Sequence, residues 1–209
     1  MASEVFAAME ASPRQLDNAM GKESRSAANL RLYRAYANDP DYKDVYFDST
    51  SGGMTAVHKG HNWEHNSSDT MRFFDGMTKE DLEKEFAMEV VRMGGSAIMQ
   101  DESRKRADGT KLPALDVKLN GILTDVRSVT ERTDTYKNHL DNKKKQLTKW
   151  NRENPNNKSR TITLYFHDPS MFSEKKMSDT LNEVRRYRRN YRYVKVVVRG
   201  AERIRTYRV

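Results

Sequence analysis

The segment from residue 113 to residue 130 constrains the fold of this chain more than any other part of the sequence. Two runs of alternating apolar and polar residues flank the dipeptide Asn120-Gly121, and this combination is the strongest short signal for a β-hairpin. Acidic residues are depleted in strand interiors, yet Asp116 and Asp125 lie on the two predicted arms. Two aspartates on neighbouring strands of one hairpin therefore suggest a metal site.

The alternation assigns each arm two faces. The first arm places Leu115, Val117 and Leu119 on one face and Asp116 and Lys118 on the other, and the second arm places Asp125, Arg127 and Val129 together. Side chains on one face of paired strands lie about 5 Å apart, so we expect the two carboxylates to converge if the sheet twists or bulges. Two carboxylates suit Mg²⁺ or Mn²⁺. Exposed aspartates balanced by Lys118 and Arg127 are the structural alternative.

A helix is predicted before the hairpin, from Thr78 to Gly94. Thr78 is a suitable N-cap with Asp81 three residues later, and Gly94 ends the pattern. One apolar stripe follows helical spacing through Leu82, Phe86, Val90 and Met93. Glu85 falls at the border of this stripe, where a carboxylate can reach a site at the sheet edge, and we prefer it over Glu83 and Glu89.

The helix and hairpin resemble a known motif. An acidic residue on one strand, followed by Asp/Glu-x-Lys on the next, is typical of the PD-(D/E)XK nuclease superfamily, and here Asp116 is followed after eight residues by Asp125-Val126-Arg127. Residues 78–170 most resemble the tRNA-cleaving C-terminal domains of contact-dependent growth-inhibition toxins and similar domains beside phage head-morphogenesis proteins. The chain departs from the motif twice: Pro113 is not directly followed by Asp, and Arg127 replaces the expected Lys.

The resemblance implies a mixed α/β fold, with a PD-(D/E)XK-like core of a central mixed sheet flanked by helices. It implies a metal-dependent nuclease acting on RNA, in which Asp116, Asp125 and Glu85 hold Mg²⁺ or Mn²⁺. Arg127 or Lys118 would stabilise negative charge, but Arg127 cannot deprotonate water because an arginine guanidinium stays protonated in proteins. The alternative is a catalytically degenerate phage or mobile-element protein that retains the fold and binds nucleic acid or a capsid partner.

Positive charge is concentrated at the C-terminal end. Residues 184–209 contain ten basic residues and one acidic residue, Glu202, whereas the whole chain has a net charge of +8. Arginine predominates, and its planar guanidinium suits phosphate groups and stacking on bases. The predicted nucleic-acid-binding residues are Arg185, Arg186, Arg188, Arg189 and Arg192, with Lys149 from the preceding basic helix. A solvated basic surface is the alternative interpretation.

The rest of the chain supplies the predicted framework. Helices are expected over about 130–150 and 172–189, a core strand over 161–166, and a final hairpin over 193–207. Residues 1–44 are expected to form a helical N-terminal arm and residues 45–209 a nuclease-like domain. His58, His61 and His65 are close in sequence, but their spacing fits no standard zinc site, so we expect them to be loop residues.

The composition excludes some classes of protein. No run of eighteen apolar residues is present, so no membrane span and no membrane partner are expected. The absence of cysteine excludes disulfides and thiolate metal sites. Given the resemblance, we expect a cytoplasmic location in a bacterial cell or carriage in a phage particle, with an immunity protein or a phage structural protein as an additional partner.

Overall fold

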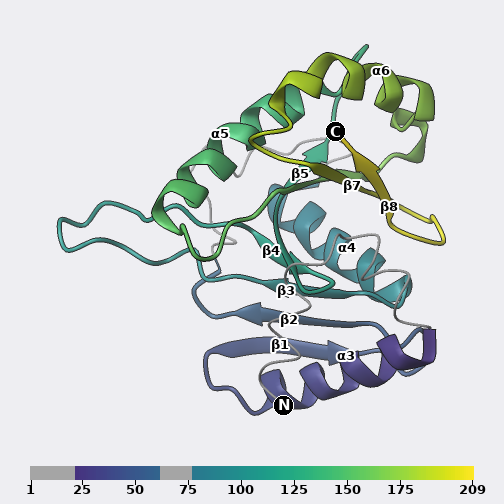
Figure 1. Cartoon of the computed structure of the whole chain (residues 1–209). Helices are drawn as coiled ribbons and strands as arrows, with labels where there is room; N and C mark the ends of the chain where they lie inside the picture. The colour runs from purple at the N-terminus through teal and green to yellow at the C-terminus, as the bar shows by residue number, and fades with distance from the viewer. Residues whose placement is uncertain (1–21, 62–76) are drawn as a thin grey trace.

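The computed structural model describes residues 22–61 and 77–209, which form an eight-stranded mixed sheet with helices on both faces (Figure 1). The strands lie side by side in the order in which they occur along the chain. They are β1 (Tyr42–Phe47), β2 (Met54–His58), β3 (Ser96–Met99), β4 (Val117–Leu119), β5 (Ile122–Val129), β6 (Thr161–Phe166), β7 (Tyr193–Val198) and β8 (Arg205–Arg208). The predicted mixed α/β class is confirmed.

Four α-helices cover this sheet within the described residues. They are α3 (Lys22–Ala37), α4 (Lys79–Arg92), α5 (Lys137–Glu153) and α6 (Glu174–Val184). Along β6, Leu164 packs in the core under α5 and α6, whereas its neighbour Tyr165 packs in the core under α4. Because successive strand residues point to opposite faces, α4 lies on one face and α5 and α6 lie on the other. The helix α3 runs along β1 and β2 (Figure 1).

The predicted turn at Asn120-Gly121 joins β4 to β5. Both residues have positive φ, 49° and 81°, as a type I′ turn requires. The Asn120 side chain also accepts a hydrogen bond from Ser96 N at 2.7 Å, so the turn is attached to the beginning of β3. This part of the sequence prediction is confirmed in its position and in its chemistry.

The first arm of the hairpin is shorter than predicted. Because β4 begins only at Val117, Leu115 packs with α5 and α6 while Val117 and Leu119 pack with α4. The expected alternation therefore breaks at Asp116, where the chain changes faces. On the second arm, Ile122–Thr124 pair with β4, whereas Asp125–Val129 pair with β6. Strand β5 thus exchanges one neighbour for another at Asp125.

Several predicted boundaries shift. The helix α4 begins with the predicted capping box of Thr78 and Asp81. The helix α5 begins at Lys137 instead of residue 130, and α6 ends at Val184 instead of residue 189, followed by the 3-10 turn η4 (Arg185–Tyr187). The run helix, strand, hairpin, helix, strand from α4 to β6 has the predicted order.

The N-terminal segment joins the main sheet. Of the predicted helical arm, α3 is confirmed, and residues 1–21 lie outside the described part of the chain. Strand β1 forms an antiparallel hairpin with β2, with an irregular register between Lys43 and Tyr46, and β2 pairs in parallel with β3. The proposed domain boundary after residue 44 falls inside β1 and remains a prediction. None of the described helices is long and apolar enough to span a membrane.

We expect Asn120→Ala to lower the free energy of unfolding by about 2 kcal/mol. About 1 kcal/mol comes from placing Ala at positive φ, and about 1 kcal/mol from losing the bond to Ser96 N. Asn120→Gly tolerates positive φ and should lose only the second part. Urea unfolding measures both differences, and an Asn120→Ala midpoint equal to that of the unchanged protein would contradict this account of the turn.

Candidate functional site

The two predicted aspartates meet at one lysine. Lys143 Nζ lies 3.2 Å from Asp116 Oδ2 and 2.9 Å from Asp125 Oδ1. The Asp125 side chain is fully buried, and those of Asp116 and Lys143 are largely so. Sequence analysis brought the two aspartates together correctly but did not assign Lys143 to the site.

The exchange of partners along β5 creates this arrangement. Asp116 lies just before the first residue of β4, and its Oδ2 accepts a hydrogen bond from Val126 N at 2.7 Å, where β4 no longer pairs with β5. On α5, Leu140 and Leu147 are fully buried. Lys143 lies between them at helical spacing, so its ammonium is directed toward the sheet.

The electrostatics of the two aspartates differ. Burial alone would raise the pKa of Asp116, but the Lys143 charge, the interaction with Asp125 and the Val126 N–H hold that pKa well below its usual range. Burial and the neighbouring Asp116 charge raise the pKa of Asp125 well above its usual range, despite Lys143. The two carboxylates outweigh the burial of Lys143 and raise its pKa, so the ammonium keeps its proton at neutral pH.

The donor set fits a hard divalent cation. Among the described residues, the buried Asp125 Oδ2 has no hydrogen-bond partner other than the Asp116 carboxyl group beside it. Mg²⁺ is commonly held by one or two carboxylates together with water and substrate phosphate. Asp116 and Asp125 would provide such ligands. No set of three His, Cys, Asp or Glu side chains able to hold an ion occurs within residues 22–61 and 77–209.

A second group of charged side chains adjoins Asp116. His61 Nε2 lies 3.4 Å from Glu83 Oε2, and His61 Nδ1 lies 3.3 Å from Glu102 Oε1. Lys79 pairs with Glu83 at 3.4 Å, and Lys111 pairs with Glu102 at 3.7 Å. This network connects α4 with the loop that follows β3. Sequence analysis considered His61 and Glu83 without preferring either, and it did not identify Glu102.

The charges of this network depend on one another. Burial, the Asp116 charge and the Glu83 charge raise the pKa of Glu102 to about 7, although His61 and Lys111 oppose the shift. Burial lowers the pKa of His61, but Glu83 and Glu102 outweigh it and raise that pKa overall. Glu102 is therefore the carboxyl group of the network that exchanges a proton near neutral pH.

The predicted helix carboxylate, Glu85, points elsewhere. It accepts a hydrogen bond from Tyr165 OH and lies 2.6 Å from His167 Nδ1. Asp125 pairs with Ile162 at the other end of β6, and three residues along a strand span about 10 Å. Glu85 is therefore not brought to the two aspartates. Glu83, two residues earlier on α4, is directed toward the network beside Asp116.

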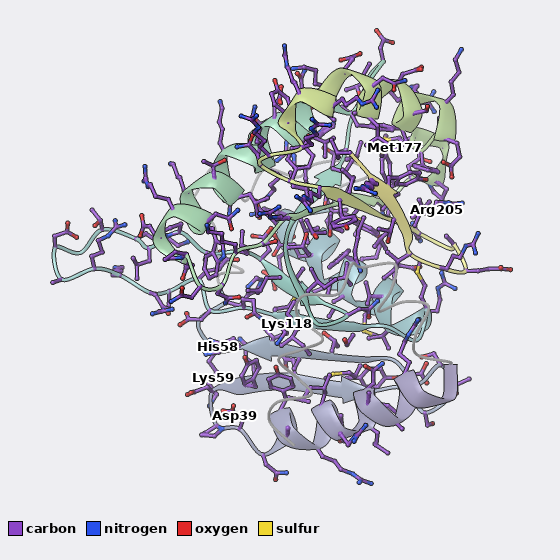
Figure 2. The ribbon with its side chains drawn as sticks, viewed as in Figure 1. Asp39, His58, Lys59, Lys118, Met177 and Arg205 are labelled. Carbon is purple, nitrogen blue, oxygen red and sulfur yellow. The ribbon has the colours of Figure 1, made fainter. Side chains whose placement is uncertain are left out.

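The two other predicted cationic residues lie apart from Lys143. Arg127 is half-buried two residues beyond Asp125. Burial lowers the pKa of His139 on α5, and the Arg127 charge lowers it further. Lys118 lies on β4, between Ile98 of β3 and Leu123 of β5, and Figure 2 places it within the sheet. Among the contacts of the described residues, Lys143 supplies the ammonium that reaches both aspartates.

The three clustered histidines are separated. His61 joins the network beside Asp116, whereas His58 lies 3.9 Å from Asp101 at the end of β2. Figure 2 shows His58 and Lys59 near Asp39 at this end of the sheet. His65 lies outside the described residues. This separation gives no support to a zinc site formed by these histidines.

A groove of about 590 Å³ runs beside the network. Two acidic residues, Glu102 and Glu153, line it together with five basic residues, Arg106, Lys111, Lys145, Lys149 and Arg152. The predicted nucleic-acid-binding residue Lys149 thus belongs to a basic groove that contains a carboxylate next to Asp116. A polyanion in this groove would pass close to the two aspartates.

The arginines and the tyrosines of the basic C-terminal segment are placed differently. Arg185, Arg186, Arg188, Arg189 and Arg192 are exposed, as phosphate contacts require. The neighbouring tyrosines are engaged within the fold: Tyr191 is fully buried, the ring of Tyr187 packs against Lys144, and Tyr207 donates a hydrogen bond to Glu174. The guanidinium groups are therefore better placed than the aromatic rings to contact nucleic acid.

Comparison with known proteins gives no family. No protein-family model, curated protein or solved structure matched this chain. The superfamily resemblance accordingly stays a prediction that depends on the residues and their geometry.

We expect Lys143→Met to lower the free energy of unfolding by about 3 kcal/mol at pH 7, because two buried carboxyl groups lose their shared cation. Without Lys143 the pKa of Asp116 in the folded protein rises above its unfolded value near 4, and the pKa of Asp125, already raised by burial and by Asp116, rises further. The folded variant then binds more protons than the unfolded chain, so the loss should shrink as pH falls. Lys145→Met, at an exposed position of the same helix, is the matched control, and equal losses in the two variants would contradict the proposed ion pairing.

Glu102→Gln tests the network beside Asp116. The pKa of Glu102 is about 7 in the folded protein and near 4 in the unfolded chain. Between these pH values the folded protein binds one more proton than the unfolded chain, so its stability falls as pH rises through this range. Glu102→Gln removes this dependence, so its stability relative to the unchanged protein should increase by about 3 kcal/mol between pH 4 and pH 8. Chemical unfolding at both pH values measures the change. Glu183→Gln, at an exposed position, should show no such change, and parallel behaviour of the two variants would refute the assignment.

Proposed function

We propose that this chain is a metal-dependent phosphodiesterase that cleaves nucleic acid, with RNA as the favoured substrate. The observation that carries the proposal is the convergence of Asp116 and Asp125 on Lys143 at 3.2 and 2.9 Å. The element order from α4 to β6 and the basic groove beside the site add support. The resemblance to tRNA-cleaving toxin domains suggests a toxin activity, for which a structured RNA such as tRNA would be the substrate.

The chemistry would divide among a few residues. Asp116 and Asp125 would hold Mg²⁺ or Mn²⁺, and such an ion, when bound, lowers the pKa of a coordinated water and polarises a phosphodiester. Lys143 keeps its proton, so it would offset negative charge on the phosphoryl group and would not act as a base. It would provide the ammonium that the resembled motif places at the position of Arg127. Glu102, with a pKa of about 7, is able to accept a proton beside the groove.

One observation favours a second function. The Lys143 ammonium already compensates Asp116 and Asp125, and Arg127 replaces the expected Lys. A protein that retains the fold only to bind nucleic acid, as a phage or mobile-element component, would have no need of a cation. Titration calorimetry with Mn²⁺ separates the two functions: binding that Asp125→Asn abolishes favours catalysis, and absence of binding favours the scaffold.

Cleavage of RNA with Mg²⁺ or Mn²⁺ tests the proposal directly. Asp125→Asn should lower the rate at least about 100-fold, because it removes a ligand. Lys143→Gln should cost about 100-fold through lost charge stabilisation. Circular dichroism is needed to confirm that each variant is folded. Equal rates for the unchanged protein and a folded Asp125→Asn variant would end the proposal.

Two neighbouring glutamates on α4 provide matched controls in the same assay. Glu83→Gln should lower the rate about tenfold, because Glu83 holds His61 in the network beside Asp116. Glu85→Gln should leave the rate nearly unchanged, because its partners are Tyr165 and His167. A loss of activity only in Glu85→Gln would show that Glu85, and not Glu83, is the carboxylate of α4 that acts with the two aspartates.

A further inference from the structure

Six arginines gather around one cavity at the C-terminal end of the chain. The cavity measures about 930 Å³, and the arginines that line it, here called the arginine pocket, are Arg160, Arg185, Arg188, Arg189, Arg192 and Arg208. All six are exposed. Arg160 and Arg208 are far in sequence from the η4 segment, so sequence reasoning did not connect them with it. The fold therefore converts a basic stretch of sequence into a concave site.

The pocket is held in place by the backbone. Arg160 O accepts hydrogen bonds from Arg192 N at 2.8 Å and Tyr193 N at 3.1 Å, and Arg192 O accepts one from Val209 N at 2.9 Å. These bonds keep Arg160, Arg192 and Arg208 next to one another at the ends of β6, β7 and β8. Because the backbone is fixed before any ligand arrives, binding has to order only the arginine side chains.

The η4 side of the pocket is fixed as well. Val184 and Tyr191, which flank the segment that carries Arg185, Arg188 and Arg189, are fully buried. Asn190 Nδ2 lies 3.3 Å from Thr148 Oγ1 of α5, and Lys144 Nζ lies 3.4 Å from the centre of the Tyr187 ring. The segment is thus attached to α5, the helix that carries Lys143.

The chemistry of the pocket indicates phosphate groups. The described residues that line it include no acidic and no aromatic side chain, and none of the six arginines forms an ion pair within the described part of the chain. Guanidinium groups bind phosphate oxygens in pairs, and the described lining offers no aromatic ring on which successive bases could stack. This lining favours recognition of the ligand through its phosphates.

Two arginines of the pocket, Arg160 and Arg192, lie at the same end of the sheet as the two aspartates. Asp125 pairs with Ile162, which follows Arg160 by two residues. Ile162 in turn pairs with Val194, which follows Arg192 by two residues. The strands β5, β6 and β7 run in parallel, and two strand spacings correspond to about 10 Å. Successive phosphates of one strand can therefore occupy the pocket while a later phosphodiester reaches Asp116 and Asp125.

We propose that the arginine pocket binds consecutive backbone phosphates of the nucleic-acid strand that is cleaved at Asp116 and Asp125, without reading its bases. The identity of this strand rests on the proposed function, whereas phosphate binding by the pocket does not. RNA and DNA share the backbone phosphate, and the experiment distinguishes them.

Binding without hydrolysis tests the pocket by itself. The unchanged protein in EDTA is titrated against labelled single-stranded RNA and DNA of about twelve nucleotides, and against a polyglutamate peptide. The triple variant Arg185→Gln, Arg188→Gln, Arg189→Gln should raise Kd for both nucleic acids about tenfold and reduce the slope of log Kd against log salt by about 2. The control triple Arg31→Gln, Arg34→Gln, Lys43→Gln removes the same charge from exposed positions of α3 and β1, and should change Kd less than about twofold.

Several results would overturn the proposal. Equal losses of affinity in the two triple variants would show that nucleic acid responds to the total charge of the protein and not to the pocket. Equal affinity for polyglutamate and RNA would show that the pocket does not select phosphate groups. Absence of nucleic-acid binding in EDTA would exclude the pocket altogether. In cleavage assays the pocket triple should raise KM about tenfold with kcat unchanged, and a lower kcat with KM unchanged would refute the shared strand.

Discussion

The exchange of partners along β5 is the feature on which the rest of the site depends. Up to Thr124 the strand pairs with β4, and from Asp125 it pairs with β6. Where β4 ends, the backbone N–H of Val126 needs another acceptor, since a buried polar group without a partner is costly. Asp116 supplies that acceptor. This local requirement brings one carboxylate beside another in the interior, and Lys143 makes the resulting charge tolerable.

The centre of the site consists of two buried carboxyl groups that lie side by side. At the centre of the site two carboxyl groups share a single ammonium. In the adjoining network His61, Lys79 and Lys111 pair with Glu83 and Glu102. A structure held only by ion pairing would be expected to balance its charges. A buried pair of carboxyl groups whose pKa values are shifted in opposite directions is more typical of a functional site, at which a ligand can supply positive charge.

Sequence reasoning succeeded where local chemistry determines structure. The Asn120-Gly121 turn and the Thr78 cap depend on residues within a few positions of one another, and both were found where the sequence placed them. It failed where the outcome depended on packing between distant elements. Glu85 and Glu83 are separated by about 200° around α4, and only the position of the helix on the sheet decides which one faces Asp116.

Lys143 illustrates a signal that was present but not used. It lies between the buried Leu140 and Leu147 at helical spacing, and a lysine on the apolar face of a helix calls for a buried acidic partner. The tyrosines between the arginines received no role from the sequence, and the fold uses Tyr191 as a core residue. Such use of an aromatic residue cannot be recognised before the elements are assembled.

The outer strands of the sheet carry a further consequence. A long mixed sheet exposes unpaired backbone groups at its two margins, and these can recruit a strand from another molecule. Strand β1 interrupts its margin with an irregular register and with Asp44 at a φ of 49°. Strand β8 is only four residues long and begins and ends with arginine. Distortion at one margin and charge at the other protect the protein against aggregation through its edges.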